Sequence, residues 1–348
     1  MIRRALTALV TTVLLGYAAV IGYFKLNETS LVYHPAERRL TPPPDALGLP
    51  IERVSLRTAD SLSLVAWAIP AAGADSSGMW LIVCHGNYGN ISYGARPRFY
   101  SYMREVGLNL LAFDYRGFGE SEGVPTERGV YADAVAAYDH LRTVRNVPAE
   151  RIIIFGHSLG SGVAIELATR VPAAGLIVEG AFTSVPDRGR EIYPWLPVRL
   201  IASNRFASID KVKRIAMPKL FLHSPADDII PIDHGRRLFA EAAPPKRLVE
   251  LHGGHDDAYT GPCASSHGRP HTVRPAAPGI RQRARLKRIW VSTRLRLVTS
   301  LRRHHRELVS LLLVTGSVLL AAGTAEAAMT TTPTHTPGVA GIGVQSVP

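Results

Sequence analysis

Short apolar runs alternate along the middle of the chain with longer stretches whose apolar residues recur at helical spacing. Runs of this length are typical of strands covered on both faces of a sheet. One intervening stretch, residues 131–143, predicts a helix with Ala132, Val135, Ala136 and Tyr138 near one face. Strands are predicted at residues 51–57, 62–69, 80–83, 108–113, 152–155, 175–178, 220–223 and 247–251. The alternation predicts an α/β fold built on a doubly wound, mostly parallel, eight-stranded sheet.

The first apolar run lies at the N-terminus and is longer than any strand. Residues 5–24 carry no charge, Arg3 and Arg4 precede them, and Lys25 follows. About 20 residues are needed to cross a bilayer, whereas the apolar core of a cleaved signal peptide has ~7–15. Basic residues at its start favour a cytoplasmic N-terminus. We therefore expect residues 1–25 to be a single-pass membrane anchor with the catalytic part on the extracytoplasmic side; a cleaved signal peptide is the alternative.

The net charge of +12 is unevenly distributed along the chain. Residues 262–348 hold twelve basic and two acidic side chains, so +10 lies there and only +2 in residues 1–261. The basic balance is therefore no reason to expect binding of nucleic acid. The two cysteines, Cys84 and Cys263, provide no disulfide framework.

The chain changes character near residue 261. A stretch rich in Pro, Ser, His and Gly gives way to a basic stretch and then to a second apolar segment at 308–323. Residues 302–327 resemble a secretory signal. We expect residues 261–348 to be a basic tail that is disordered or foreign to the fold, the product of a frameshift, read-through or fusion. The alternative is an amphipathic helix on anionic lipid followed by a second membrane segment.

A nucleophile elbow is the strongest chemical signal. Residues 151–160 read RIIIFGHSLG, a buried strand that runs into Gly-His-Ser-Leu-Gly, and a helix-compatible sequence follows. A serine hydroxyl is a poor nucleophile and must stand on a tight strand-to-helix turn where a base can reach it. Ser158 is the predicted nucleophile, and the amide of Leu159 would point into an oxyanion hole.

The remaining groups should follow in the order Ser, Asp or Glu, His. Downstream, the segment PADDIIP offers Asp227 or Asp228 as the acid, and the spacing to Pro231 favours Asp227. His255 lies in a glycine turn after the last strand and is the expected base, ahead of His252.

A second oxyanion donor is expected upstream of the elbow. The predicted strand at 79–83 leads into HGNYGN, where the amide of Asn87 would face the same oxygen as that of Leu159. His85 is expected only to hydrogen-bond this loop.

Five motifs, HGNYGN, DYRGFGESEG, GHSLG, HSPADDIIP and GGHDD, occur in the order seen in α/β-hydrolases. The chain most resembles the membrane-anchored abhydrolase domain-containing serine hydrolases, a branch that includes depalmitoylases and lipid or ester hydrolases. The resemblance implies a hydrolase domain over residues 31–260. It also implies the triad Ser158, Asp227 and His255 with oxyanion amides from Asn87 and Leu159.

Two acids in the second motif are assigned structural roles on the same resemblance. Asp114 and Glu120 belong to DYRGFGESEG, which is then a loop after a strand. We expect them to serve packing and turn formation, not catalysis.

A hydrolase of this kind can carry a lid between residues 181 and 219, and here that segment is short. We predict a minimal cap whose aromatic and apolar residues line an acyl pocket, with Trp195 and, from the oxyanion loop, Tyr88 as substrate contacts. The alternative is a helix that packs its apolar face on the sheet.

These residues predict a serine hydrolase that cleaves an ester or thioester of a lipid or acylated protein through an acyl-enzyme. The chemistry requires no metal or organic cofactor, and we expect a monomer that binds no nucleic acid. An acyltransferase or a serine peptidase could use the same triad. An inactive, membrane-tethered binding protein with a damaged C-terminus is the third alternative.

Overall fold

The structure is a computed structural model that describes residues 1–35, 40, 47–73 and 78–256. The predictions for the basic tail at 261–348, with its apolar segment at 308–323, lie outside the described residues. The final residues of the expected hydrolase domain lie outside them as well.

An eight-stranded sheet forms the centre of the molecule, in the order β2-β3-β6-β4-β7-β8-β9-β10. β3 pairs antiparallel with both β2 and β6, and the remaining neighbours are parallel. The strands are β2 Glu52–Arg57, β3 Ser63–Ile69, β4 Trp80–Cys84, β6 Asn109–Phe113, β7 Ile152–His157, β8 Gly175–Glu179, β9 Lys219–His223 and β10 Lys246–Glu250. Every predicted strand is present with its ends shifted by two residues at most, and the predicted α/β fold class is confirmed.

Helices cover both faces of the sheet, so successive strand residues enter two different cores. In β4, Ile82 packs with residues of α4 and α5, whereas Leu81 packs with Tyr100 of α3 on the other face. Because both faces are covered, the central strands are apolar without alternation. The covering helices are α3 Arg96–Glu105, α4 Glu127–Asp139, α5 Leu159–Arg170, α8 Ser208–Lys211 and α9 Ile232–Glu241.

The helix predicted at 131–143 begins earlier and ends differently. Thr126 caps α4 by accepting a hydrogen bond from Gly129 N at 3.1 Å, and after Asp139 the chain makes a π-helical turn, His140–Val144. The expected apolar face was half wrong. Ala136 and Tyr138 are buried, but Ala132 and Val135 are only partly so. The helix is enclosed on most sides, and even Asp133 is buried because it binds Arg116 of the neighbouring loop.

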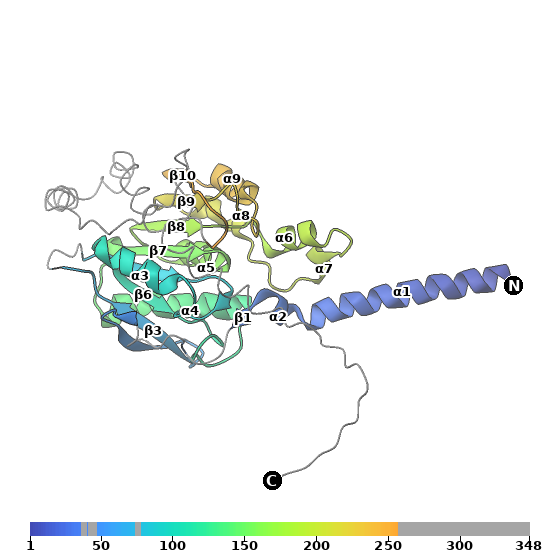
Figure 1. Cartoon of the computed structure of the whole chain (residues 1–348), viewed down its shortest axis with the longest axis horizontal. Coiled ribbons are helices and arrows are strands. Elements are labelled where there is room, and N and C mark those ends of the chain that lie inside the picture. Colours follow the sequence, from blue (N-terminus) through green and yellow to red (C-terminus); the bar gives the residue numbers. More distant parts are fainter. Residues whose placement is uncertain (36–39, 41–46, 74–77, 257–348) are drawn as a thin grey trace, which may run out of the picture.

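The N-terminal helix α1, Ile2–Leu26, projects from the body of the molecule (Figure 1). None of its residues is buried, and it is long and apolar enough to cross a membrane. A helix of this length and apolarity near an N-terminus can also belong to a signal sequence. A short helix, α2 Glu28–Val32, joins it to a two-stranded parallel sheet of β1 His34–Pro35 and β5 Tyr88–Gly89.

The cap predicted between β8 and β9 is small. It contains α6 Val185–Ile192 and α7 Val198–Ile201, which lie beside the base of α1 (Figure 1). A Cβ added to Gly189 would lie 2.9 Å from Val198 Cγ1, so the glycine permits the close approach of α6 and α7.

Candidate active site

Ser158 stands on a sharp turn between β7 and α5. Its backbone has φ of 54° and ψ of −123°, a conformation that non-glycine residues rarely adopt. The turn requires its glycines, since a Cβ on Gly156 would lie 2.2 Å from Gly160 O and one on Gly160 would lie 2.0 Å from Cys84 O. The geometry is therefore that of a strained strand-to-helix elbow.

Asp227 and His255 are bonded to each other beside this turn. His255 Nδ1 lies 2.8 Å from Asp227 Oδ2, and both residues are buried. Asp227 Oδ1 accepts the amides of Ile229 at 3.0 Å and Ile230 at 2.7 Å. The neighbouring Asp228 is exposed. Of the two acids that the sequence left open, only Asp227 is within bonding distance of His255.

The electrostatics of this pair favour charge separation. Burial opposes ionisation of Asp227, but hydrogen bonds from His223, His255 and the Ile230 amide outweigh it and hold its pKa well below the usual range. Burial likewise opposes protonation of His255, yet the hydrogen bond and the charge of Asp227 raise its pKa. Such a pairing fixes the Nδ1–H tautomer and leaves Nε2 free to accept a proton.

A second histidine holds the acid, and the sequence reasoning missed it. His223, at the end of β9, places Nε2 2.8 Å from Ile230 O and 3.4 Å from Asp227 Oδ2. Its only signal in the sequence is its place at the start of HSPADDIIP.

His157, the residue before Ser158, contacts the loop that carries His255. Its Nε2 is 3.3 Å from His255 O, and the two rings are 5.0 Å apart. Burial and the charge of His255 lower the pKa of His157 to about 4. Ligand atoms of His157, His255 and Asp256 lie within 4.8 Å of one another, which is the one group of this kind in the described part of the chain. A cation there would compete with Ser158 for His255.

The loop after β4 lies against the serine. A Cβ on Gly86 would be 3.4 Å from Ser158 Cβ, and Asn87 lines the same cavity as Ser158 and Leu159. His85 lies below this loop with Nδ1 2.7 Å from Gly86 O. Its position agrees with the structural role expected for it.

Asp114 and Glu120 of DYRGFGESEG make structural contacts. Asp114 is fully buried, and its Oδ1 accepts the amide of Ile91 at 2.8 Å. Glu120 pairs with Arg53 at the surface. Both contacts are structural, as expected.

An apolar cavity of about 300 Å³ opens over Ser158. Its walls include Ile192, Tyr193 and Leu196 from the cap and Phe24 from α1. Tyr88 and Trp195, the expected substrate contacts, do not line it. The ring of Tyr88 lies edge-on to that of Tyr93, with 4.9 Å between the ring centres. Trp195 lies at the surface against Tyr193.

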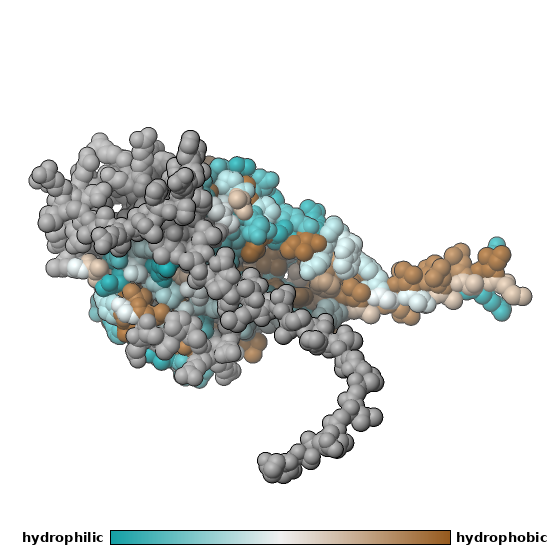
Figure 2. Space-filling model, viewed as in Figure 1, coloured by the Kyte–Doolittle hydropathy of each residue, from teal (hydrophilic) through white to brown (hydrophobic). Residues whose placement is uncertain are grey.

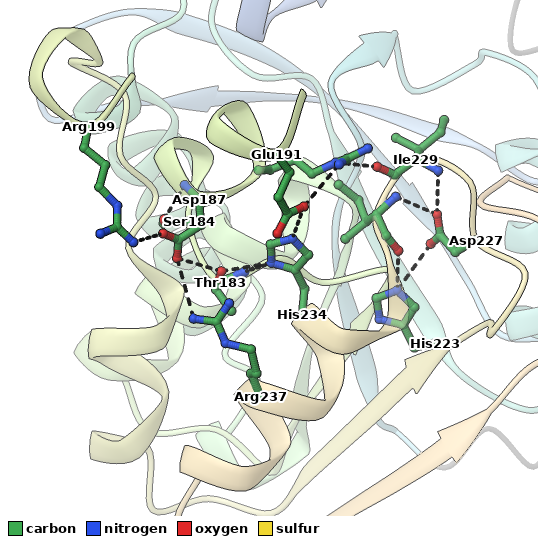
Figure 3. A network of polar contacts seen from close by, with 12 residues as sticks. Thr183, Ser184, Asp187, Glu191, Arg199, His223, Asp227, Ile229, His234 and Arg237 are labelled. Carbon is green, nitrogen blue, oxygen red and sulfur yellow. Dashed lines mark hydrogen bonds and ion pairs between the residues drawn. The ribbon is translucent and has the colours of Figure 1, made fainter. Parts of the chain in front are cut away.

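Polar contacts tie the cap to the acid loop (Figure 3). Arg188 Nε of α6 donates to Ile229 O at 2.7 Å, and the amide of Ile229 in turn donates to Asp227. A parallel connection runs from Glu191 to His234, with Oε2 3.0 Å from Nε2. The position of α6 and that of the acid are thus coupled through a few bonds.

The network continues to the base of the cap. His234 Nδ1 lies 2.9 Å from Thr183 Oγ1, which donates to Asp187 Oδ2 at 2.9 Å. Arg199 of α7 donates to Asp187 Oδ1 of α6 at 2.7 Å, so the network includes both cap helices (Figure 3).

Comparisons with known proteins identify the family and the fold. Residues 78–209 match the family described as serine aminopeptidase, S33. An uncharacterised protein of Mycobacterium tuberculosis is 38% identical over 251 residues, which cover 71% of this chain and 87% of that protein. The lysophosphatidylserine lipase ABHD12 of Danio rerio is 34% identical over 55% of this chain, and the match spans 53% of the lipase.

A solved structure shows the same fold at low identity. The Pyrococcus furiosus esterase Pf2001 superposes with a TM-score of 0.53 and 18% identity over 64% of this chain and 90% of the esterase. Fold, motifs and relatives agree, and the chain belongs to the α/β-hydrolase family, in which it resembles the abhydrolase domain-containing serine hydrolases.

Proposed function

We propose that this chain is a membrane-anchored serine hydrolase that cleaves an ester or thioester of an acyl substrate. One observation carries the proposal: Ser158 stands on a strained elbow at the wall of an apolar cavity, beside a buried Asp227–His255 pair. A structural role alone would not require a serine in so unfavourable a backbone conformation.

The chemistry follows from the position of each group. Ser158 Oγ attacks the acyl carbonyl while His255 Nε2 takes its proton, and Asp227 stabilises the imidazolium through Nδ1–H. The amides of Asn87 and Leu159 receive the developing oxyanion. His255 then protonates the leaving alcohol or thiol. In the second half of the reaction water attacks the acyl carbon while His255 takes its proton, and His255 returns that proton to Ser158 Oγ as the acid leaves.

The cavity favours an acyl chain over a peptide. The matched family description suggests an aminopeptidase, whose site must hold a positively charged α-amino group. Among the residues that line the cavity, Glu28 is the one acid, and its oxygens already accept bonds from Ser203, Asn204 and Lys25. The lipase among the relatives also supports a lipid ester as substrate.

The proposal includes the membrane topology. Residues 1–25 anchor the chain, Arg3 and Arg4 hold the N-terminus in the cytoplasm, and the domain from residue 31 lies on the other side. Protease treatment of spheroplasts from an expressing bacterium tests this, because an extracytoplasmic domain is degraded and a cytoplasmic one is protected.

A fluorophosphonate probe tests the enzymatic part. The probe reacts with activated serines whatever the substrate, so full-length protein in membranes should be labelled, and boiled protein should not. An unlabelled native protein would favour the inactive binding protein. Products formed with an added alcohol would separate a hydrolase from an acyltransferase.

A further inference from the structure

The N-terminal helix reaches the substrate cavity. Phe24, near the end of α1, lines the cavity that contains Ser158, and so do Glu28, Leu31 and Val32 of α2. The cap contributes Ile192 of α6 and Tyr193, which follows α6. The cavity is therefore lined both by an apolar helix of membrane-spanning length and by the cap.

Glu28, the first residue of α2, fastens the segment that follows α1 to the chain just after α7. Its Oε1 accepts the amides of Ser203 at 2.7 Å and Asn204 at 2.6 Å, and the Asn204 side chain at 3.1 Å. Burial opposes ionisation of Glu28, but these hydrogen bonds, with that from Lys25, outweigh it and lower its pKa. Lys25 Nζ also donates to Ile201 O at 2.7 Å, at the end of α7.

Aromatic contacts extend the attachment along α1. The Phe24 ring lies edge-on to Tyr193 at 5.1 Å and to Trp195 at 6.1 Å, and Tyr17 donates its hydroxyl to Trp195 O at 2.8 Å. From Tyr17 to Lys25, α1 is thus held along about two turns, and Glu28 of α2 extends the attachment.

Apolar side chains are exposed on the cap around this contact, among the charged Arg190, Glu191 and Arg199. Trp195 is 54% exposed, Leu200 is 87% exposed and Ile192 is also exposed, as is Ile229 of the neighbouring acid loop. Isolated apolar side chains at a surface are ordinary, but Trp195 also contacts Phe24 of α1, and Figure 2 shows apolar patches on the body near the base of the apolar α1. Trp and Tyr are the residues that favour the boundary between lipid and water.

We propose that the end of α1 and α2 form a wall of the acyl-binding site, and that the cap rests on the bilayer holding α1, so that a long acyl chain enters the cavity directly from the membrane. This rests on the proposed function. A bilayer amphiphile would slide its chain along Phe24 towards Ser158 while its headgroup stays at the interface. An acyl chain that enters from the lipid does not pass through water, where exposure of its apolar surface is unfavourable.

Phe24→Trp tests the wall. The larger ring projects into the cavity, so kcat/KM for a long-chain p-nitrophenyl ester in phosphatidylcholine vesicles should fall about tenfold, the effect of a crowded hydrophobic pocket. Acetyl ester hydrolysis and fluorophosphonate labelling should fall less, so the ratio of long-chain to acetyl activity decreases. Tyr23→Trp is the matched control, since the neighbouring Tyr23 is 60% exposed and does not line the cavity.

The possible outcomes separate the two proposals. An unlabelled wild-type protein would sink the proposed function. Normal labelling with the same chain-length profile in the wild type and Phe24→Trp would overturn the wall while leaving the hydrolase in place. An N-terminus found by mass spectrometry to begin after Leu26 would also overturn it, because Phe24 would then be absent.

Brominated phosphatidylcholine tests the contact with the bilayer. Bromine quenches tryptophan only at close range, so intrinsic fluorescence in these vesicles should decrease, and the decrease should be smaller in Trp195→Phe. Equal quenching in both proteins would overturn entry from the membrane. The acetyl ester serves as the folding control for this variant.

Discussion

The imidazole of His223 fills the space that a side chain on Gly235 would need. A Cβ built on Gly235 would lie 2.4 Å from His223 Nδ1 and 3.1 Å from its Cγ. The same ring reaches Ile230 O and Asp227 Oδ2 through Nε2. Gly235 of α9 therefore leaves room for His223, and His223 in turn holds the loop that carries Asp227. No catalytic step uses His223 itself.

Gly235→Ala should consequently lower both stability and turnover. The added methyl forces the ring of His223 away from Asp227, an overpacking that costs about 1–3 kcal/mol in a well-packed interior. Thermal unfolding and hydrolysis of a short p-nitrophenyl ester measure the two effects. Glu241→Ala, an exposed change at the end of the same helix, is the control. A variant with native stability and turnover would contradict the positioning role of His223.

Ser158→Ala should abolish fluorophosphonate labelling and reduce ester hydrolysis by roughly 10⁴- to 10⁶-fold, the usual cost of losing a triad nucleophile. Folding should be retained, because alanine is smaller than serine and can occupy the same place on the turn between β7 and α5. Gel fluorescence after labelling and circular dichroism check both parts. Residual labelling at the wild-type level would place the nucleophile elsewhere.

Asp227→Asn and Asp228→Asn form a matched pair. Each replaces one charge without a change of size, but only Asp227 bonds to His255, at 2.8 Å, whereas Asp228 is exposed. Loss of the bonded acid leaves the imidazole in the wrong tautomer, which costs about 10⁴-fold in a well-studied triad, so kcat should fall steeply in Asp227→Asn alone. Equal losses in the two variants would reassign the acid.

The strands and the elbow could be predicted because each has a local signal in the sequence. Apolar runs bounded by polar residues define β4 and β7, and GHSLG marks the turn by its own residues, although Gly160 also lies against Cys84 of the distant strand β4. The pair Asp227 and His255 followed from motif order. The ends of α4 did not, because its cap at Thr126 and its near-complete enclosure depend on packing with other elements.

Contacts between distant segments were beyond the sequence pattern. The cavity is lined by Asn87 and Leu196, the immediate neighbours of the expected Tyr88 and Trp195, because small changes of loop direction decide which side chain points inward. The sequence of α1 indicates only that the helix is long and apolar. It therefore could not predict that Phe24 lines the same cavity.

The pH dependence of hydrolysis should report the bond between Asp227 and His255. Attack requires neutral His255, so kcat/KM falls as the pH drops through the pKa of that histidine. Asp227 raises this pKa above the ordinary value of 6.5, and the acidic limb of the profile should therefore lie above pH 6.5. His157, with its pKa lowered to about 4, stays neutral across this range and does not contribute.

In Asp227→Asn the charge that raises the pKa of His255 is lost, so the acidic limb should move to lower pH while the maximal kcat/KM falls. Asp228→Asn should keep the limb of the wild type. Profiles measured with a soluble acetyl ester from about pH 5 to 9 check this, and a limb unmoved in Asp227→Asn would show that another group sets it.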